Sequence, residues 1–96
     1  MKTIVNFIDA QQMAQQYPET FSAPSLKELQ DIKIGHFVKV CVENERFWCK
    51  VLDISDLDRL LCKIDNDLVF TKVHQLKCGD ILVIHPRFIY SIWVSP

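Results

Sequence analysis

The sequence predicts a mainly β fold with a minor helical part, and three observations lead to this class. Residues 37–52 alternate between apolar and polar side chains on both sides of a polar pair that can form a turn. Further short apolar runs follow at residues 59–65, 81–85 and 88–94. No segment after residue 35 has the length and periodicity of a long helix. We therefore expect short N-terminal helices followed by a bent antiparallel sheet or an SH3-like, partly open barrel.

The 96 residues are expected to form one small domain preceded by a leader. We place a helical leader at residues 1–23 and a small β-rich domain at residues 24–96. In the leader, Asp9 can cap a short helix over residues 10–16, and Pro18 follows as a stop signal.

A second short helix is expected to begin at Pro24-Ser25. Ser25 and Glu28 stand at capping-box spacing, at which each side chain accepts a hydrogen bond from the backbone N–H of the other residue. Gly35 then breaks the helical pattern before the first strand.

The segment from Phe37 to Leu52 predicts a β-hairpin closed by a two-residue turn at Asn44-Glu45, because Asn tolerates positive φ. Counting back from that turn pairs Lys39 with Lys50, and opposed residues share a face. The face expected to be core is apolar throughout and consists of Val38, Val40, Val42, Phe47, Cys49 and Val51. The other face, which we call the outer face, carries Lys39, Cys41, Glu43, Arg46, Trp48 and Lys50.

The next strand is assigned from the same alternation. Residues 59–65 place Leu60, Cys62 and Ile64 inward, and Asp65-Asn66-Asp67 follows as a turn. Residues 68–71 are expected to form a short fourth strand.

Two strands are expected near the C-terminus. Residues 81–85 form the first, with His85 on its inward side, and Pro86 ends it because proline cannot donate to a ladder. Residues 88–94 form the last strand. Its Tyr90 and Trp93 should point to opposite faces, so we expect one of them to be partly exposed.

The composition is that of an ordinary globular chain, with 49% hydrophobic and 24% charged residues. With a net charge of −1, the chain as a whole does not attract nucleic acid or an anionic membrane. A local basic patch is still compatible with this net charge. No apolar run approaches the roughly 20 residues of a membrane-spanning helix. Asn6 and Asp9 interrupt the N-terminal apolar residues, unlike a secretory signal. We therefore expect a cytoplasmic protein with no membrane partner.

The cysteines are widely spaced at Cys41, Cys49, Cys62 and Cys78, with no Cys-x-x-Cys pair and no close Cys/His pair. We expect reduced, structural thiols, no metal site and no cofactor.

Several short motifs stand in order along residues 24–93: Pro24-Ser25, Gly35-His36-Phe37-Val38-Lys39-Val40, Glu45-Arg46-Phe47-Trp48, Asp65-Asn66-Asp67-Leu68, Gly79-Asp80 and Ile89-Tyr90-Ser91-Ile92-Trp93. With these motifs the chain resembles the YegJ-like group of small uncharacterised bacterial domains. A Gly-Asp pair would be usual in that group where this chain has Gly35-His36. The resemblance implies a compact β-rich domain in a bacterial cytoplasm, and it implies no reaction.

The outer face is the candidate binding surface. If the third strand pairs with the second, three lysines fall in a row around Trp48, as on a surface that tracks phosphates and stacks bases. The residues proposed for binding are Lys39, Arg46, Trp48, Lys50, Arg59 and Lys63. In the alternative interpretation these lysines only solvate the face and guard against aggregation, and the N-terminal helices cover Trp48.

The sequence lacks the motifs that catalysis and calcium binding would require. His74 and His85 with Cys49 or Cys62 could form a Cys–His pair, but no Ser or Cys lies in a recognisable nucleophile elbow, so we expect no catalytic residues. The turn at residues 65–67 lacks the Gly and the distal Glu of an EF-hand loop.

The sequence therefore favours a non-enzymatic binding module, a monomer or weak dimer, that recognises a protein or peptide partner through its outer face. One alternative is the binding of single-stranded nucleic acid by the Trp and Lys surface. A second alternative is a small hydrolase or metal-binding protein.

Overall fold

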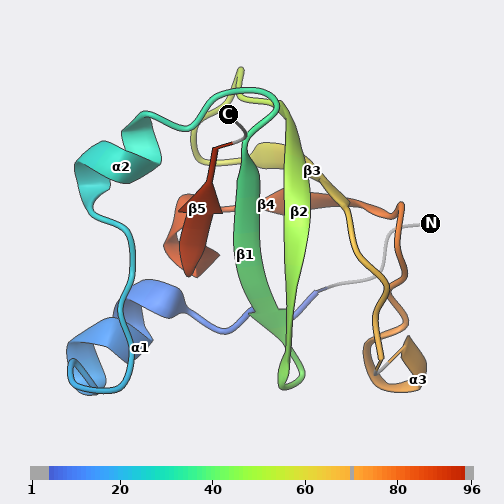
Figure 1. The fold of residues 1–96 in the computed structure, drawn as a ribbon, viewed down its shortest axis with the longest axis horizontal. Helices are drawn as coiled ribbons and strands as arrows, with labels where there is room; N and C mark the ends of the chain where they lie inside the picture. Colours follow the sequence, from blue (N-terminus) through green and yellow to red (C-terminus); the bar gives the residue numbers. More distant parts are fainter. Residues whose placement is uncertain (1–4, 70, 95–96) are drawn as a thin grey trace.

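The computed structural model describes residues 5–69 and 71–94, which form a five-stranded antiparallel sheet with short helices around it (Figure 1). The strands are β1 (Phe37–Val42), β2 (Glu45–Asp53), β3 (Leu60–Ile64), β4 (Ile81–Ile84) and β5 (Ser91–Trp93). The helices are α1 (Ala10–Gln16), α2 (Leu26–Gln30), α3 (Thr71–His74) and the short 3₁₀ helix η1 (Pro86–Phe88). The predicted class, a mainly β fold with a bent antiparallel sheet, is confirmed.

The sheet has the strand order β4-β3-β2-β1-β5 and does not close into a barrel, because its edge strands β4 and β5 do not pair with each other. The register between β2 and β3 shifts between Val51 and Asp53, and such a bulge bends a strand and increases its twist. In Figure 1, β3 and β4 accordingly run across the direction of β1, while α1 and α2 lie beside β5. Among the described residues, no helix has the length and apolar character needed to cross a membrane.

The turn of the β1–β2 hairpin lies one residue earlier than the sequence predicts. Glu43 and Asn44 form the loop with φ values of 50° and 67°, and a type I′ turn needs positive φ at both central residues. Lys39 therefore pairs with Trp48 and not with Lys50. The prediction was wrong because it treated Glu45 as a solvated turn residue, whereas its side chain is buried against His74 and belongs to the strand.

The assignment of side chains to the two faces is confirmed despite the wrong turn. Moving the turn by one residue shifts every cross-strand partner by two positions, and this preserves the alternation of faces. All six residues assigned to the core face are at most 2% exposed: Val38, Val40, Val42, Phe47, Cys49 and Val51. These side chains form the main core together with the inward residues of β3 and β4.

Strand β3 has the predicted alternation, and its inward residues Leu60, Cys62 and Ile64 are at most 1% exposed. The predicted fourth strand at residues 68–71 is wrong. Leu68 and Val69 lie outside any strand, Phe70 lies outside the described residues, and Thr71 begins α3. The backbone N–H of Val69 donates to the Glu45 carboxylate and not to a strand ladder.

The prediction that His85 points inward is also wrong. The pairing of β3 with β4 places Leu82 and Ile84 in the core, and His85 leaves the strand as the exposed N-cap of η1. The last strand is shorter than predicted, because Phe88 belongs to η1. One of the two C-terminal aromatic residues is exposed, as expected: Trp93 is 50% exposed, whereas Tyr90 is 8% exposed.

Both predicted helix caps are confirmed. The Asp9 carboxylate accepts a hydrogen bond from the Gln12 N–H at the start of α1, and Ser25 and Glu28 form a complete capping box on α2. Helix α1 packs on the sheet through Ala10, which lies in a small second core with Cys41 and Tyr90.

Candidate functional site: an aromatic and cationic sheet face

The outer face extends beyond the hairpin and across neighbouring strands. Backbone pairing places Trp93, Phe37, Lys50 and Lys63 side by side in one row that crosses β5, β1, β2 and β3. The adjacent row holds Ser91, Lys39 and Trp48. Paired residues of an antiparallel sheet point to the same side, so aromatic and cationic side chains from four strands share one face.

Three aromatic side chains cross this face diagonally, and we call Phe37, Trp48 and Trp93 the aromatic stripe. The ring centroids of Phe37 and Trp93 are 5.4 Å apart at an interplanar angle of 53°, a favourable distance for an aromatic pair. The ammonium group of Lys39 lies 5.4 Å from the ring centroid of Trp48, which is within the range of a cation–π contact. The exposed half of Trp93 makes this an accessible aromatic surface.

The aromatic stripe lines a cavity of about 350 Å³ together with Asp65 and Asn66. No residue of α1 or α2 lines this cavity, so the helices leave the Trp48 side of the face open. The loop on its far side is fixed to β2. Asn66 accepts a hydrogen bond from the Trp48 N–H at 2.7 Å through Oδ1, and the Asp65 N–H donates to the Trp48 carbonyl at 2.9 Å.

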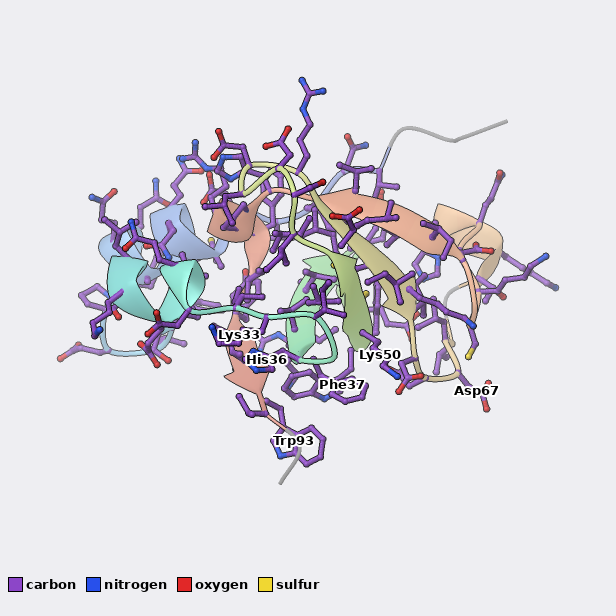
Figure 2. All side chains as sticks on the ribbon, turned by 90° about the horizontal axis from the view of Figure 1, so that it is seen from above. Lys33, His36, Phe37, Lys50, Asp67 and Trp93 are labelled. Atoms are coloured by element: carbon purple, nitrogen blue, oxygen red, sulfur yellow. The ribbon has the colours of Figure 1, made fainter. Side chains whose placement is uncertain are left out.

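Lysines flank the aromatic stripe. Lys50 and Lys63 are directly opposed on β2 and β3, and neither ammonium group has a hydrogen-bond or ion-pair partner among the described residues. Opposed like charges destabilise a sheet slightly, and an anion bound between them would relieve that repulsion. Figure 2 shows that Lys33 and His36 project from the same side of the molecule as Phe37, Lys50 and Trp93.

The structure brings together four of the six predicted binding residues, namely Lys39, Trp48, Lys50 and Lys63. Arg46 also belongs to the outer face, but its guanidinium carbon lies 5.2 Å from the Tyr90 ring centroid and 5.7 Å from that of Phe21. Arg46 therefore covers the second core. Arg59 precedes β3, at the end opposite Lys63, and lines a separate hollow with Phe7 and Val83.

Sequence reasoning missed Phe37 and Trp93 as members of the site. Both are apolar residues at strand ends, where the pattern also fits a core position. The signal that could have found them is the pairing of β5 with β1, which places Trp93 opposite Phe37. That pairing joins segments more than 50 residues apart in the sequence.

Among the residues that the structure describes, neither histidine considered for catalysis has a thiol partner. His74 Nδ1 accepts from the Leu76 N–H at 3.1 Å, so its ring proton lies on Nε2, which is 2.9 Å from Glu45 Oε1. His85 Nδ1 accepts from the Arg87 N–H. Burial raises the pKa of Cys62 to about 12 and also raises that of Cys49. A nucleophilic thiol needs the opposite shift, so neither buried cysteine suits catalysis.

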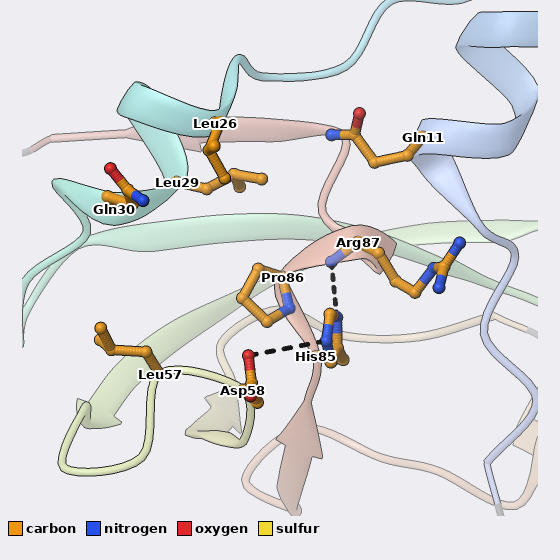
Figure 3. A pocket seen from close by; sticks show the side chains of 9 residues that line it. All are labelled: Gln11, Leu26, Leu29, Gln30, Leu57, Asp58, His85, Pro86 and Arg87. Carbon is orange, nitrogen blue, oxygen red and sulfur yellow. Dashed lines mark hydrogen bonds and ion pairs between the residues drawn. The ribbon is translucent and has the colours of Figure 1, made fainter.

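A second cavity, of about 430 Å³, lies between α2, the loop after β2 and η1 (Figure 3). Leu26 and Leu57 on its walls are exposed. Its ionisable groups already have partners: His85 Nε2 lies 3.8 Å from Asp58, and Arg87 Nε lies 2.6 Å from Asp9, which is outside the cavity wall. The aromatic face differs because Lys50 and Lys63 have no ion-pair partner in the part of the chain that the structure describes.

Within residues 5–69 and 71–94, no three His, Cys, Asp or Glu side chains gather as a metal site would require. Comparison of the chain with protein-family models, with curated proteins and with solved structures gave no significant match.

Proposed function

We propose that this protein is a non-enzymatic binding module whose outer sheet face binds single-stranded nucleic acid. The observation that carries the proposal is the aromatic stripe across β5, β1 and β2 with lysines on both of its sides. Bases stack on exposed aromatic rings of a sheet, and lysines beside the rings attract the phosphates. The net charge of −1 is compatible with this function, because binding depends on the local charge of the face.

A double helix fits the face less well than a single strand does. The stripe offers the flat surfaces of aromatic rings, and only unstacked bases can lie against such surfaces. The cavity is open on the outer face and adjoins Lys39 and Lys50, which are neighbours of Trp48 and Phe37 in the sheet. A bound strand can therefore place bases on the stripe and its backbone along the lysines.

A second candidate function is the binding of an extended protein or peptide segment. It is favoured by the position of β5 at the edge of the sheet, next to the exposed ring of Trp93. An edge strand offers unpaired backbone groups to an added strand, and neighbouring pockets select side chains. Such binding is nearly indifferent to salt. A peptide library displayed on phage tests it, if the clones that bind the protein fail to bind the Trp93→Ala variant.

The direct test of the nucleic acid proposal is the fluorescence anisotropy of a labelled, mixed-sequence single-stranded oligonucleotide. If Lys39, Lys50 and Lys63 contact phosphates, affinity falls on the order of 20-fold between about 50 and 200 mM salt. Trp93→Ala removes an exposed stacking ring and should weaken binding by roughly 5-fold to 150-fold. Lys50→Gln should weaken binding and flatten its salt dependence.

Two matched variants separate the face from the rest of the molecule. Lys72→Gln removes one exposed charge on α3, and Leu57→Ala trims an exposed apolar side chain at the second cavity. Both should bind as the unchanged protein does. Binding that ignores salt, or that survives Trp93→Ala and Lys50→Gln unchanged, would contradict the proposal.

A further inference from the structure

We infer that the cavity on the aromatic face is a base site selective for guanine, in which the Asp65 carboxylate recognises the Watson–Crick edge. The inference rests on the proposed binding of single-stranded nucleic acid and adds the identity of the preferred base. The wall of the cavity consists of three aromatic rings, one carboxylate and one amide.

The rings supply the stacking surfaces. Phe37 and Trp93 line one part of the cavity and Trp48 another, and the volume of about 350 Å³ falls in the range of small-ligand sites. A planar base that enters this space can lie against a ring while its edge faces the loop after β3, which carries Asp65 and Asn66. Stacking itself hardly distinguishes the bases.

The polar groups of the wall supply the selectivity. Asn66 is partly committed, because its Oδ1 accepts from the Trp48 N–H and one hydrogen of its Nδ2 is donated to the Asp67 carbonyl. The Asp65 carboxylate accepts no hydrogen bond from the described residues. The backbone of Asp65 is fixed by its hydrogen bond to Trp48. The Asp65 carboxylate is therefore a free acceptor with two oxygens, and the backbone that carries it is held by the sheet.

A carboxylate with two free oxygens matches guanine better than the other bases. The Watson–Crick edge of guanine presents two adjacent donors, N1–H and the 2-amino group, which can bind both oxygens at once. Adenine and cytosine each present one amino donor beside a ring nitrogen that repels a carboxylate. Thymine and uracil present one N–H between two carbonyl oxygens. Guanine alone pairs with both carboxylate oxygens and leaves no acceptor facing them.

The charge of Asp65 is compatible with a polyanionic ligand because of the neighbouring lysines. Lys63 on β3 lies two residues before Asp65, and Lys50 on β2 is the cross-strand partner of Lys63. Both ammonium groups are free among the described residues and can neutralise the phosphates on either side of the bound base.

The test is a set of oligothymidylates that differ at one central position, which is dG, dA, dC, dT or deoxyinosine. Anisotropy competition measures their affinities. Central dG should bind on the order of 10-fold more tightly than central dA, dC or dT. Deoxyinosine, which keeps N1–H and lacks the 2-amino group, should lie between them. Asp65→Asn should abolish the preference for dG, measured as the ratio of the affinities for central dG and central dT, whereas Asp67→Asn should keep the preference, because Asp67 does not line the cavity.

The outcomes separate this inference from the proposed function. Equal affinity for all five oligonucleotides overturns the guanine site and leaves nucleic acid binding intact. A preference for dG that persists in Asp65→Asn overturns the role of Asp65. The absence of binding to any of the oligonucleotides overturns the proposed function together with the inference.

Discussion

Removal of the buried carboxylate of Glu45 is the perturbation whose effect on stability follows most directly from the structure. Glu45 is 8% exposed, accepts from the Val69 N–H at 2.7 Å and lies 2.9 Å from His74 Nε2. Glu45→Ala leaves these two donors without their acceptor in a buried place. Each unsatisfied buried donor costs about 1–3 kcal/mol, so the two together cost about 2–6 kcal/mol.

We therefore expect Glu45→Ala to lower the free energy of unfolding by about 2–6 kcal/mol, from a total of about 5–15 kcal/mol for a domain of this kind. Urea unfolding followed by tryptophan fluorescence measures the change. Glu45→Gln keeps one acceptor oxygen and should lose less stability. Glu43→Gln removes the same charge from an exposed position two residues away and should change stability by less than about 0.5 kcal/mol.

The reasoning is refuted if Glu45→Ala loses less than about 1 kcal/mol, or if Glu45→Gln and Glu43→Gln behave alike. Either result would mean that the contacts of Glu45 with the segment after β3 add little to stability. The register of the hairpin would then need another explanation.

Further predictions concern the thiols, the alkaline limit of stability and the hairpin turn. Cys78 is exposed and Cys41, Cys49 and Cys62 are buried, so a thiol reagent should modify one cysteine of the folded protein at once; rapid reaction of all four would contradict the structure. Burial raises the pKa of Cys62 from 9.0 to about 12 and raises that of Cys49 in the same direction. The unfolded chain thus loses these thiol protons at a lower pH than the folded chain, so stability should be full below about pH 9 and fall as pH rises toward 12. Cys62→Ala should flatten that fall, and an unchanged profile would exclude the thiols as its cause. Glu43→Asn should raise stability by a few tenths to about 1 kcal/mol in urea unfolding, because Asn favours the positive φ observed at this position; a loss of stability would contradict the observed turn.

The faces of the strands could be predicted from the sequence because alternation is a local property. Val38, Val40 and Val42 had to share a side whichever turn closed the hairpin. The turn itself could not be predicted, because it depends on the contact of Glu45 with His74, 29 residues away. A turn preference of less than about 1 kcal/mol cannot outweigh the loss of two buried hydrogen bonds, which costs about 2–6 kcal/mol.

Only the part of the candidate site that lies on one hairpin could be predicted, because alternation is local and contacts between distant segments are not. Lys39, Trp48 and Lys50 stand on the outer face by counting along one hairpin. Trp93 joins them only through the pairing of β5 with β1, and Asp65 only through the fixation of its loop on Trp48. These are contacts between distant segments, and periodicity carries no information about them. Arg59 was predicted to belong to the site because it is basic and close to a strand in the sequence. In the structure it lines a separate hollow, away from the aromatic stripe.

The binding of single-stranded nucleic acid by the outer face can be tested by titrating the ¹⁵N-labelled protein with a single-stranded oligonucleotide and recording two-dimensional NMR spectra. If the oligonucleotide binds to the aromatic stripe, the indole N–H signals of Trp48 and Trp93 should shift most, together with the backbone amides of Lys39, Lys50 and Lys63. The amides of Leu26, Leu57 and Arg87 around the second cavity should stay in place. Shifts confined to the second cavity, or no shifts at saturating oligonucleotide, would contradict the account.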